Sequence, residues 1–69
     1  MMIGTNEPLT IVELAILGKF AIGKTHKEIM YDTHLSKLQL DRLGKSIRTK
    51  AGADNMTAAV YVYAKNNVI

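Results

Sequence analysis

Hydrophobic residues recur along this chain at the three- and four-residue spacing of amphipathic α-helices, in four segments separated by turn residues. The segments span residues 11–21, 26–32, 36–50 and 56–66. Such spacing places the hydrophobic side chains on one face of each helix, so the pattern predicts four short helices around a single core. We therefore expect an all-α fold, with one domain over residues 9–69 and a flexible N-terminal arm over residues 1–8.

Three of the four segments begin with the same capping signature, a Ser or Thr followed three residues later by Glu or Gln. The pairs are Thr10 with Glu13, Thr25 with Glu28, and Ser36 with Gln39. Each hydroxyl is expected to accept a hydrogen bond from a backbone N–H of the first turn, while the second side chain accepts one from the capping residue. Gly23 and Gly52 are the expected helix ends, and Asn55 is the expected cap of the last helix.

The predicted core follows from the same spacing. Its members are Leu14, Ile16, Leu17, Phe20 and Ala21 in the first segment, Ile29 and Met30 in the second, Leu35 in the turn 33–35, Leu40, Leu43, Gly44, Ile47 and Ala51 in the third, and Met56, Ala59, Val60, Tyr63 and Ala64 in the fourth. Leu9 is expected to pack on Leu14. The outer side of the third segment carries Leu38, Arg42, Lys45 and Thr49, flanked by Asp41 and Arg48.

The fourth segment contains a run of strong strand formers, residues 60–63. A single strand would have no partner in this chain, so we favour a helix. Its outer face would then be apolar and is a candidate homodimer interface, formed by Ala58, Tyr61, Val62 and Lys65. The alternative is an ordinary helix end with a Tyr and a Val exposed.

The composition limits the classes of function and of partner that fit this chain. The chain has 69 residues, no cysteine, nine Lys and Arg, and six Asp and Glu, giving a net charge of +3. We expect a cytoplasmic protein, because there is no secretion signal and no apolar run of membrane-spanning length. We also expect no sensing domain, because 69 residues leave no room for one. Five of the nine cations lie in the third segment, with Asp41 as its only acid: Lys37, Arg42, Lys45, Arg48 and Lys50. This cluster favours an anionic partner such as DNA, although Lys and Arg also occupy ordinary solvated helix faces.

Residues 18–25 satisfy the phosphate-binding pattern G-x-x-x-x-G-K-[ST] letter for letter. That loop needs a preceding strand and acidic residues for magnesium, whereas here the preceding segment has helical spacing. His26 and His34 lie in different segments without cysteines to assist them, and no nucleophile or carboxylate pair has a catalytic spacing. We expect no enzyme activity, no metal, no cofactor and no small-molecule ligand.

Taken together, residues 9–69 resemble the DNA-binding domain of LuxR/GerE type, without gaps. The matching positions are Leu9-Thr10, Glu13, Ala21, Gly23, Lys27-Glu28-Ile29, Leu35-Ser36, Ile47, Lys50, Gly52, Asn55, Ala59-Val60, Ala64 and Val68-Ile69. The resemblance implies a helix-turn-helix whose third helix enters the major groove and whose fourth often mediates dimerisation. It implies base contacts from Asp41, Arg42 and Lys45, and backbone contacts from Thr25, Lys27 and Gln39.

The charge and position of further residues predict additional contacts with DNA. Lys24, Lys37, Arg48 and Thr49 are predicted to contact phosphates, and Leu38 a thymine methyl group. The chain departs from the family's pattern at Val12, where an Arg is usual, at Leu43, where a polar residue is frequent, and at Asp41, where a basic residue is usual. We therefore predict a sequence-specific DNA-binding regulator that acts as a homodimer. The alternative is a protein-interaction module of the same fold that binds and modulates another regulator.

Overall fold

The structure, a computed structural model, describes residues 8–66 as four α-helices. The helices are α1 (Ile11–Ala21), α2 (His26–Thr33), α3 (Lys37–Ala51) and α4 (Met56–Lys65), and the described residues contain no strand. The all-α prediction is confirmed, including the helical conformation of residues 60–63. Several ends differ by one residue: Thr33 still belongs to α2, α3 starts after its cap Ser36 and extends to Ala51, and Asn66 follows α4. Most of the predicted arm, residues 1–7, lies outside the described residues, as do Val68 and Ile69.

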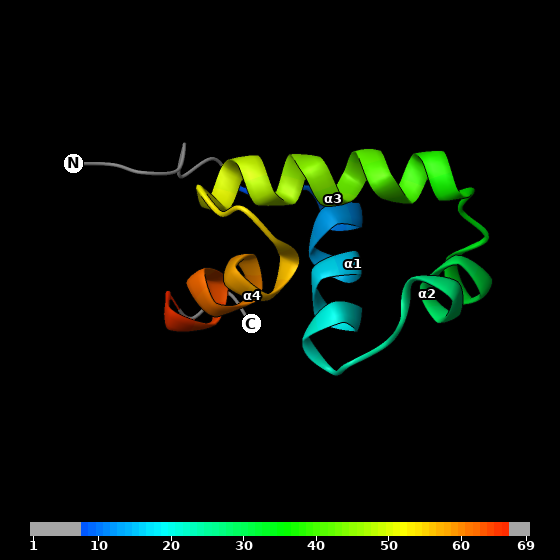
Figure 1. The fold of residues 1–69 in the computed structure, drawn as a ribbon, viewed down its shortest axis with the longest axis horizontal. Coiled ribbons are helices and arrows are strands. Elements are labelled where there is room, and N and C mark those ends of the chain that lie inside the picture. The colour runs from blue at the N-terminus through cyan, green and yellow to red at the C-terminus, as the bar shows by residue number, and fades with distance from the viewer. Residues whose placement is uncertain (1–7, 67–69) are drawn as a thin grey trace.

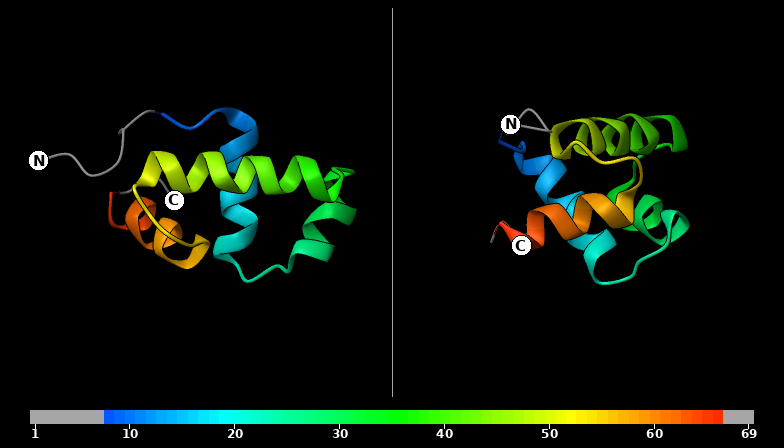
Figure 2. Two further views of the ribbon diagram at one scale, coloured as in Figure 1. Left: turned by 45° about the horizontal axis from the view of Figure 1, so that its top comes forward. Right: turned by 60° about the vertical axis from the view of Figure 1, so that its left-hand side comes forward.

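Helix α3 runs along one edge of the domain and packs against each of the other three helices (Figure 1). Helix α1 crosses it near the middle, with α4 on one side of α1 and α2 on the other, and the turned views show the same arrangement (Figure 2). The three smaller helices therefore all lie on one side of α3. Its opposite side faces away from them.

The predicted capping boxes are all present. The Thr10, Thr25 and Ser36 hydroxyls each accept a hydrogen bond from the backbone N–H three residues later, at 3.1–3.2 Å. The side chains of Glu13, Glu28 and Gln39 in turn accept a hydrogen bond from the backbone N–H of the capping residue, at 2.8–2.9 Å. Gly23 and Gly52 have left-handed φ values of 89° and 70°, as expected of residues that end helices. His34 has φ 60° and ends α2 in the same conformation, which a side chain with a Cβ adopts less readily. The helix-turn-helix therefore turns on a non-glycine residue, which the sequence did not indicate.

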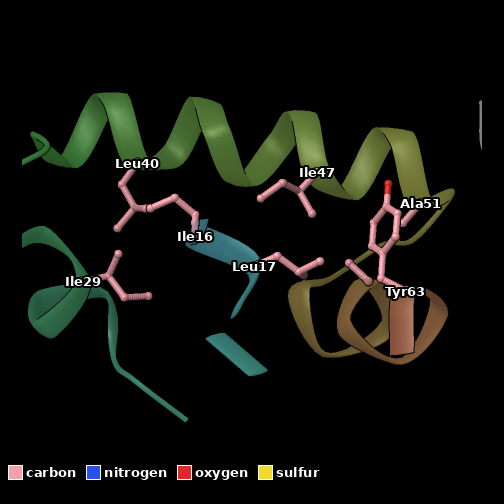
Figure 3. Close-up of a cluster of buried hydrophobic side chains, with 8 residues drawn as sticks. Ile16, Leu17, Ile29, Leu40, Ile47, Ala51 and Tyr63 are labelled. Atoms are coloured by element: carbon pink, nitrogen blue, oxygen red, sulfur yellow. The ribbon is translucent and has the colours of Figure 1, made fainter. Parts of the chain in front are cut away.

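The core is one cluster that extends on both sides of α1 (Figure 3). Toward α2, Ile16, Ile29 and Leu40 meet; toward α4, Leu17 packs with residues of α3 and α4. The buried hydrophobic residues are Ile16, Leu17, Ile29, Leu40, Ile47, Ala51, Ala59 and Tyr63. Leu35 is half-buried against this cluster, as predicted.

Four predicted positions in the helices were wrong. Leu14, Ala21 and Ala64 are exposed instead of buried, and Val62 is half-buried against the core instead of lying on an outer face. In α1 the reason is a rotation of the helix that buries Glu13 together with Ile16 and Leu17. Since α1 is apolar on nearly every side, hydrophobic spacing alone could not define its inward face.

Candidate nucleic-acid interface

Helices α2 and α3 form the helix-turn-helix, joined by residues 34–36. The turn is fixed at both ends, because His34 donates its N–H to the Met30 carbonyl at 2.9 Å and Ser36 caps α3. Between them, Leu35 inserts toward the core. The start of α3 therefore has a defined position relative to α2.

The outer side of α3 is open to solvent along its whole length. Leu38 is 59% exposed, and the other predicted members of this face are also exposed: Asp41, Arg42, Lys45 and Thr49. We call these five residues the α3 outer face. None of the described helices covers it (Figure 2). The sequence-based assignment of α3's packing and solvent sides is thus confirmed.

Three of the cations near the helix-turn-helix are held in exposed ion pairs. Lys37 Nζ lies 3.0 Å from Asp41 Oδ2, while Lys24 and Lys19 lie 3.2 and 3.6 Å from Asp32 Oδ2. The hydrogen bond from Lys24 is the main cause that lowers the pKa of Asp32 below its usual value. Exposed pairs of this kind contribute little to stability, so these lysines can exchange a carboxylate for a phosphate at small cost.

The two cations nearest the end of α3 turn away from the outer face. A Cβ built on Gly44 would lie 3.2 Å from Arg48 Nη1 and 3.5 Å from Met56 Cε, so the Arg48 side chain folds back toward the junction with α4. Lys50 points to the opposite flank, where its Nζ lies 2.6 Å from Glu13 Oε1. Of the five cations of α3, Arg42 and Lys45 occupy the outer face and Lys37 flanks it.

Glu13 is the buried charge that sequence analysis missed. It accepts hydrogen bonds from the Thr10 backbone, the Ser46 hydroxyl and Lys50, and so ties α1 to α3. Burial raises its pKa, but hydrogen bonds from Lys50, Ser46 and Thr10 more than offset this and lower the pKa from 4.5 to about 2. The sequence held one signal for this cluster: Ser46 and Lys50 are four residues apart and so lie on the same flank of the third segment. Glu13, which they contact, was predicted only to cap the first helix.

Two predicted phosphate contacts already serve as caps. Thr25 Oγ1 accepts from the Glu28 N–H, and Gln39 Oε1 accepts from the Ser36 N–H, both at the surface. Lys27 is exposed in the first turn of α2. Beside it lies a shallow hollow lined by Lys24, Lys27, Glu28, Tyr31 and Asp32. Tyr31 is 82% exposed there, a feature that sequence analysis did not single out.

The predicted dimer residues of α4 are only partly available. Tyr61 is 65% exposed and Lys65 is exposed, but Ala58 and Val62 are half-buried. The homodimer on this face stays a prediction.

Three findings concern the phosphate-loop pattern, metal ligands and membrane-spanning helices in the described residues. Residues 18–21 lie within α1, so the segment that fits the phosphate-loop pattern begins as helix. The described part of the chain brings together no group of three or more His, Asp or Glu side chains that could hold a metal ion. No described helix combines the length and apolar character needed to cross a membrane.

Comparison with known proteins adds no relative. No protein-family profile matches the chain, and neither a curated protein nor a solved structure shows significant similarity to it.

Proposed function

We propose that this protein is a small DNA-binding transcriptional regulator of LuxR/GerE type that inserts α3 into the major groove. The observation that carries the proposal is the α3 outer face, which presents Arg42 and Lys45 to solvent at a helix-turn-helix with no covering helix among the described residues. The major groove of B-DNA is wide enough for one α-helix, and an exposed helix side bearing two cations suits it. The family resemblance of the sequence points in the same direction.

In this arrangement the base contacts come from the α3 outer face. Arg42 and Lys45 donate to the guanine O6 and N7 acceptors, while Leu38 packs on a thymine methyl group. Asp41 accepts from a cytosine amino group, since a carboxylate is repelled by phosphate. Specificity for G·C pairs near Arg42 and Lys45 is therefore expected.

Phosphate contacts surround this face and hold α3 in register. Lys24 and Lys37 exchange Asp32 and Asp41 for phosphate oxygens, and Lys27 is already exposed. The remaining predicted contacts are Thr25, Gln39, Arg48 and Thr49, of which Arg48 must first swing away from Gly44. Every neutralised phosphate releases counterions, so binding should weaken steeply with salt.

The test is selection of bound duplexes from a random pool, followed by titration of the selected duplex at several salt concentrations. Arg42→Ala and Lys45→Ala should each abolish specific binding while leaving the helical circular dichroism spectrum and melting temperature unchanged. Thr57→Ala is the control, because Thr57 is an exposed residue of α4 outside the α3 outer face, the predicted phosphate contacts and the predicted dimer face, and this variant should bind almost as the unmodified protein does. Normal binding by both α3 variants would contradict the proposal.

A second candidate is a protein-interaction module that binds another regulator. It is favoured by Leu38, which is 59% exposed beside Asp41, because an apolar residue next to an acid also suits a protein partner. This candidate predicts no binding to any duplex even at low salt, together with a stable complex with a protein. Recovery of a defined sequence motif from the random pool would exclude it as the main function.

A further inference from the structure

Lys37 and Asp41 form an ion pair on the exposed side of α3, at the end where the helix begins. Lys37 is the first residue of α3, and its Nζ lies 3.0 Å from Oδ2 of Asp41, four residues further along the helix. The two side chains are 79% and 47% exposed, so solvent reaches both of them. Both members of the pair can therefore exchange partners when another molecule binds to this side of α3.

Asp41 has a lysine within reach in each direction along the helix, because residues four apart lie on the same side of an α-helix. Lys37 precedes it by four residues and Lys45 follows it by four. Among the ion pairs of the described residues, Asp41 joins Lys37 and not Lys45. Lys45 is thus available to a ligand from the start, whereas Lys37 becomes available when Asp41 releases it.

The position of Lys37 in the first turn of α3 favours contact with an anion. The N-terminal end of a helix carries partial positive charge, which disfavours a lysine there unless an anion lies beside it. A carboxylate and a phosphate can each fill this role, and exchanging one for the other costs little because exposed ion pairs contribute little to stability. Asp41 therefore competes with the phosphates of a bound duplex for the same lysine.

We propose that Asp41 couples base recognition to phosphate binding, because it releases Lys37 to the DNA backbone where it meets a cytosine. This inference rests on the proposed function and concerns the same side of α3. At a cytosine, the N4 amino group donates to the Asp41 carboxylate in place of Lys37, and Lys37 turns to a phosphate oxygen. At a thymine or a guanine, only acceptor atoms of the base face the carboxylate in the major groove, so Asp41 keeps Lys37.

The coupling makes the specific and the non-specific complex differ by one phosphate contact. Lys37 neutralises a phosphate in the specific complex and stays with Asp41 in the non-specific one. Each neutralised phosphate contributes about 0.9 to the slope of log binding constant against log salt concentration. Asp41 thus lowers the affinity for unrelated DNA more than the affinity for the target, and the acid on the α3 outer face acts as a specificity-determining residue.

The experiment measures the salt dependence of binding to the duplex selected from the random pool and to duplexes in which each C·G pair of the motif is changed in turn to T·A. For the unmodified protein, one of these changes should lower the affinity severalfold and the slope by about 0.9. Lys37→Gln should remove this slope difference by lowering the slope on the selected duplex. Asp41→Asn should remove it by raising the slope on the changed duplex. The double variant should show no further loss of preference, as expected for two residues that act together.

Lys27→Gln is the matched control, because Lys27 is an exposed lysine that forms no ion pair with another described residue. It should lower the slope by a similar amount on both duplexes and leave the difference between them intact. A slope difference that persists in Lys37→Gln, or the absence of a slope difference at every C·G pair, would overturn the coupling while leaving DNA binding by α3 in place. Failure to bind any duplex, even at low salt, would overturn the proposed function and the coupling together.

Discussion

Replacing Glu13 with Gln tests the most specific energetic feature of this domain. The side chain of Glu13 is 5% exposed, and its carboxylate holds Lys50 Nζ at 2.6 Å and the Thr10 N–H at 2.9 Å. Gln keeps the shape and one acceptor oxygen but cannot form the ion pair. The substitution therefore removes the charge while preserving most of the cap and the packing.

The size of the effect follows from the pKa of Glu13, which falls from 4.5 to about 2 in the folded protein. That difference corresponds to about 3 kcal/mol of stability when the carboxylate is ionised. Lys50 is 17% exposed and can recover some hydration in the variant, so the expected loss at pH 7 is about 2–3 kcal/mol. A domain of 69 residues has a total stability of roughly 3–10 kcal/mol, so the loss is large.

The pH dependence distinguishes an ion pair from a packing defect. Because the folded pKa of Glu13 is lowered, its stabilisation is complete above about pH 4.5 and disappears as the pH falls toward 2. The stability difference between the unmodified protein and Glu13→Gln, measured by urea denaturation at each pH, should shrink over this range. The other carboxylates are common to both proteins and cancel in the difference.

The matched control is Glu28→Gln on α2. Glu28 forms the same capping box with Thr25, at 2.8 Å, but is exposed and pairs with no lysine side chain as Glu13 does with Lys50. Its substitution should change stability far less. A difference for Glu13→Gln that stays constant from pH 7 to pH 2.5, or one no larger than that for Glu28→Gln, would refute the reasoning.

Three further predictions follow from single positions. Asp41→Asn should strengthen non-specific duplex binding severalfold at low salt, because it removes an acid that pairs with Lys37 at 3.0 Å and repels phosphate, while the preference for cytosine at the position that Asp41 contacts should weaken. Unchanged titration curves for both random and selected duplexes would argue against α3 contacting DNA. Gly23→Ala should lower the free energy of unfolding by about 1 kcal/mol, because the φ of Gly23 is 89°. Gly18→Ala should raise the free energy of unfolding by up to ~1 kcal/mol, because Gly18 lies within a helix and has equally open space around it. Equal effects of the two substitutions in thermal melts would contradict this. Ile47→Ala, at a fully buried position, should cost about 2–5 kcal/mol and leave much of the protein unfolded at 25 °C by circular dichroism.

The sequence defined local structure well because its signals are local. Capping boxes act over three residues, so the starts of α1, α2 and α3 were predicted correctly. The two sides of α3 were also correct, since its cations and hydrophobic residues separate cleanly around the helix.

Features that depend on contacts between residues far apart in the sequence could not be predicted from these local signals. The Glu13–Lys50 pair joins residues 37 positions apart, and Glu13 lies on the buried side of α1 with Ile16 and Leu17. The hydrophobic pattern of α1 was compatible with several rotations, which is why Leu14 and Ala21 were placed wrongly. The Arg48 side chain lies over Gly44, where no side chain blocks it, and near Met56 of α4. The hydrophobic pattern of the third segment alone does not show how α4 packs there.

The core described above has a consequence for how such a protein can evolve. Leu40 and Ile47 hold the inner side of α3 in the core, so the orientation of the helix does not depend on any residue of its outer face. Leu38, Asp41, Arg42 and Lys45 can therefore change without altering the scaffold that presents them. If the face meets DNA, new target sequences are reachable by single substitutions that leave folding intact. Under the proposed function, stability and specificity would be encoded on opposite sides of one helix, and selection could act on each separately.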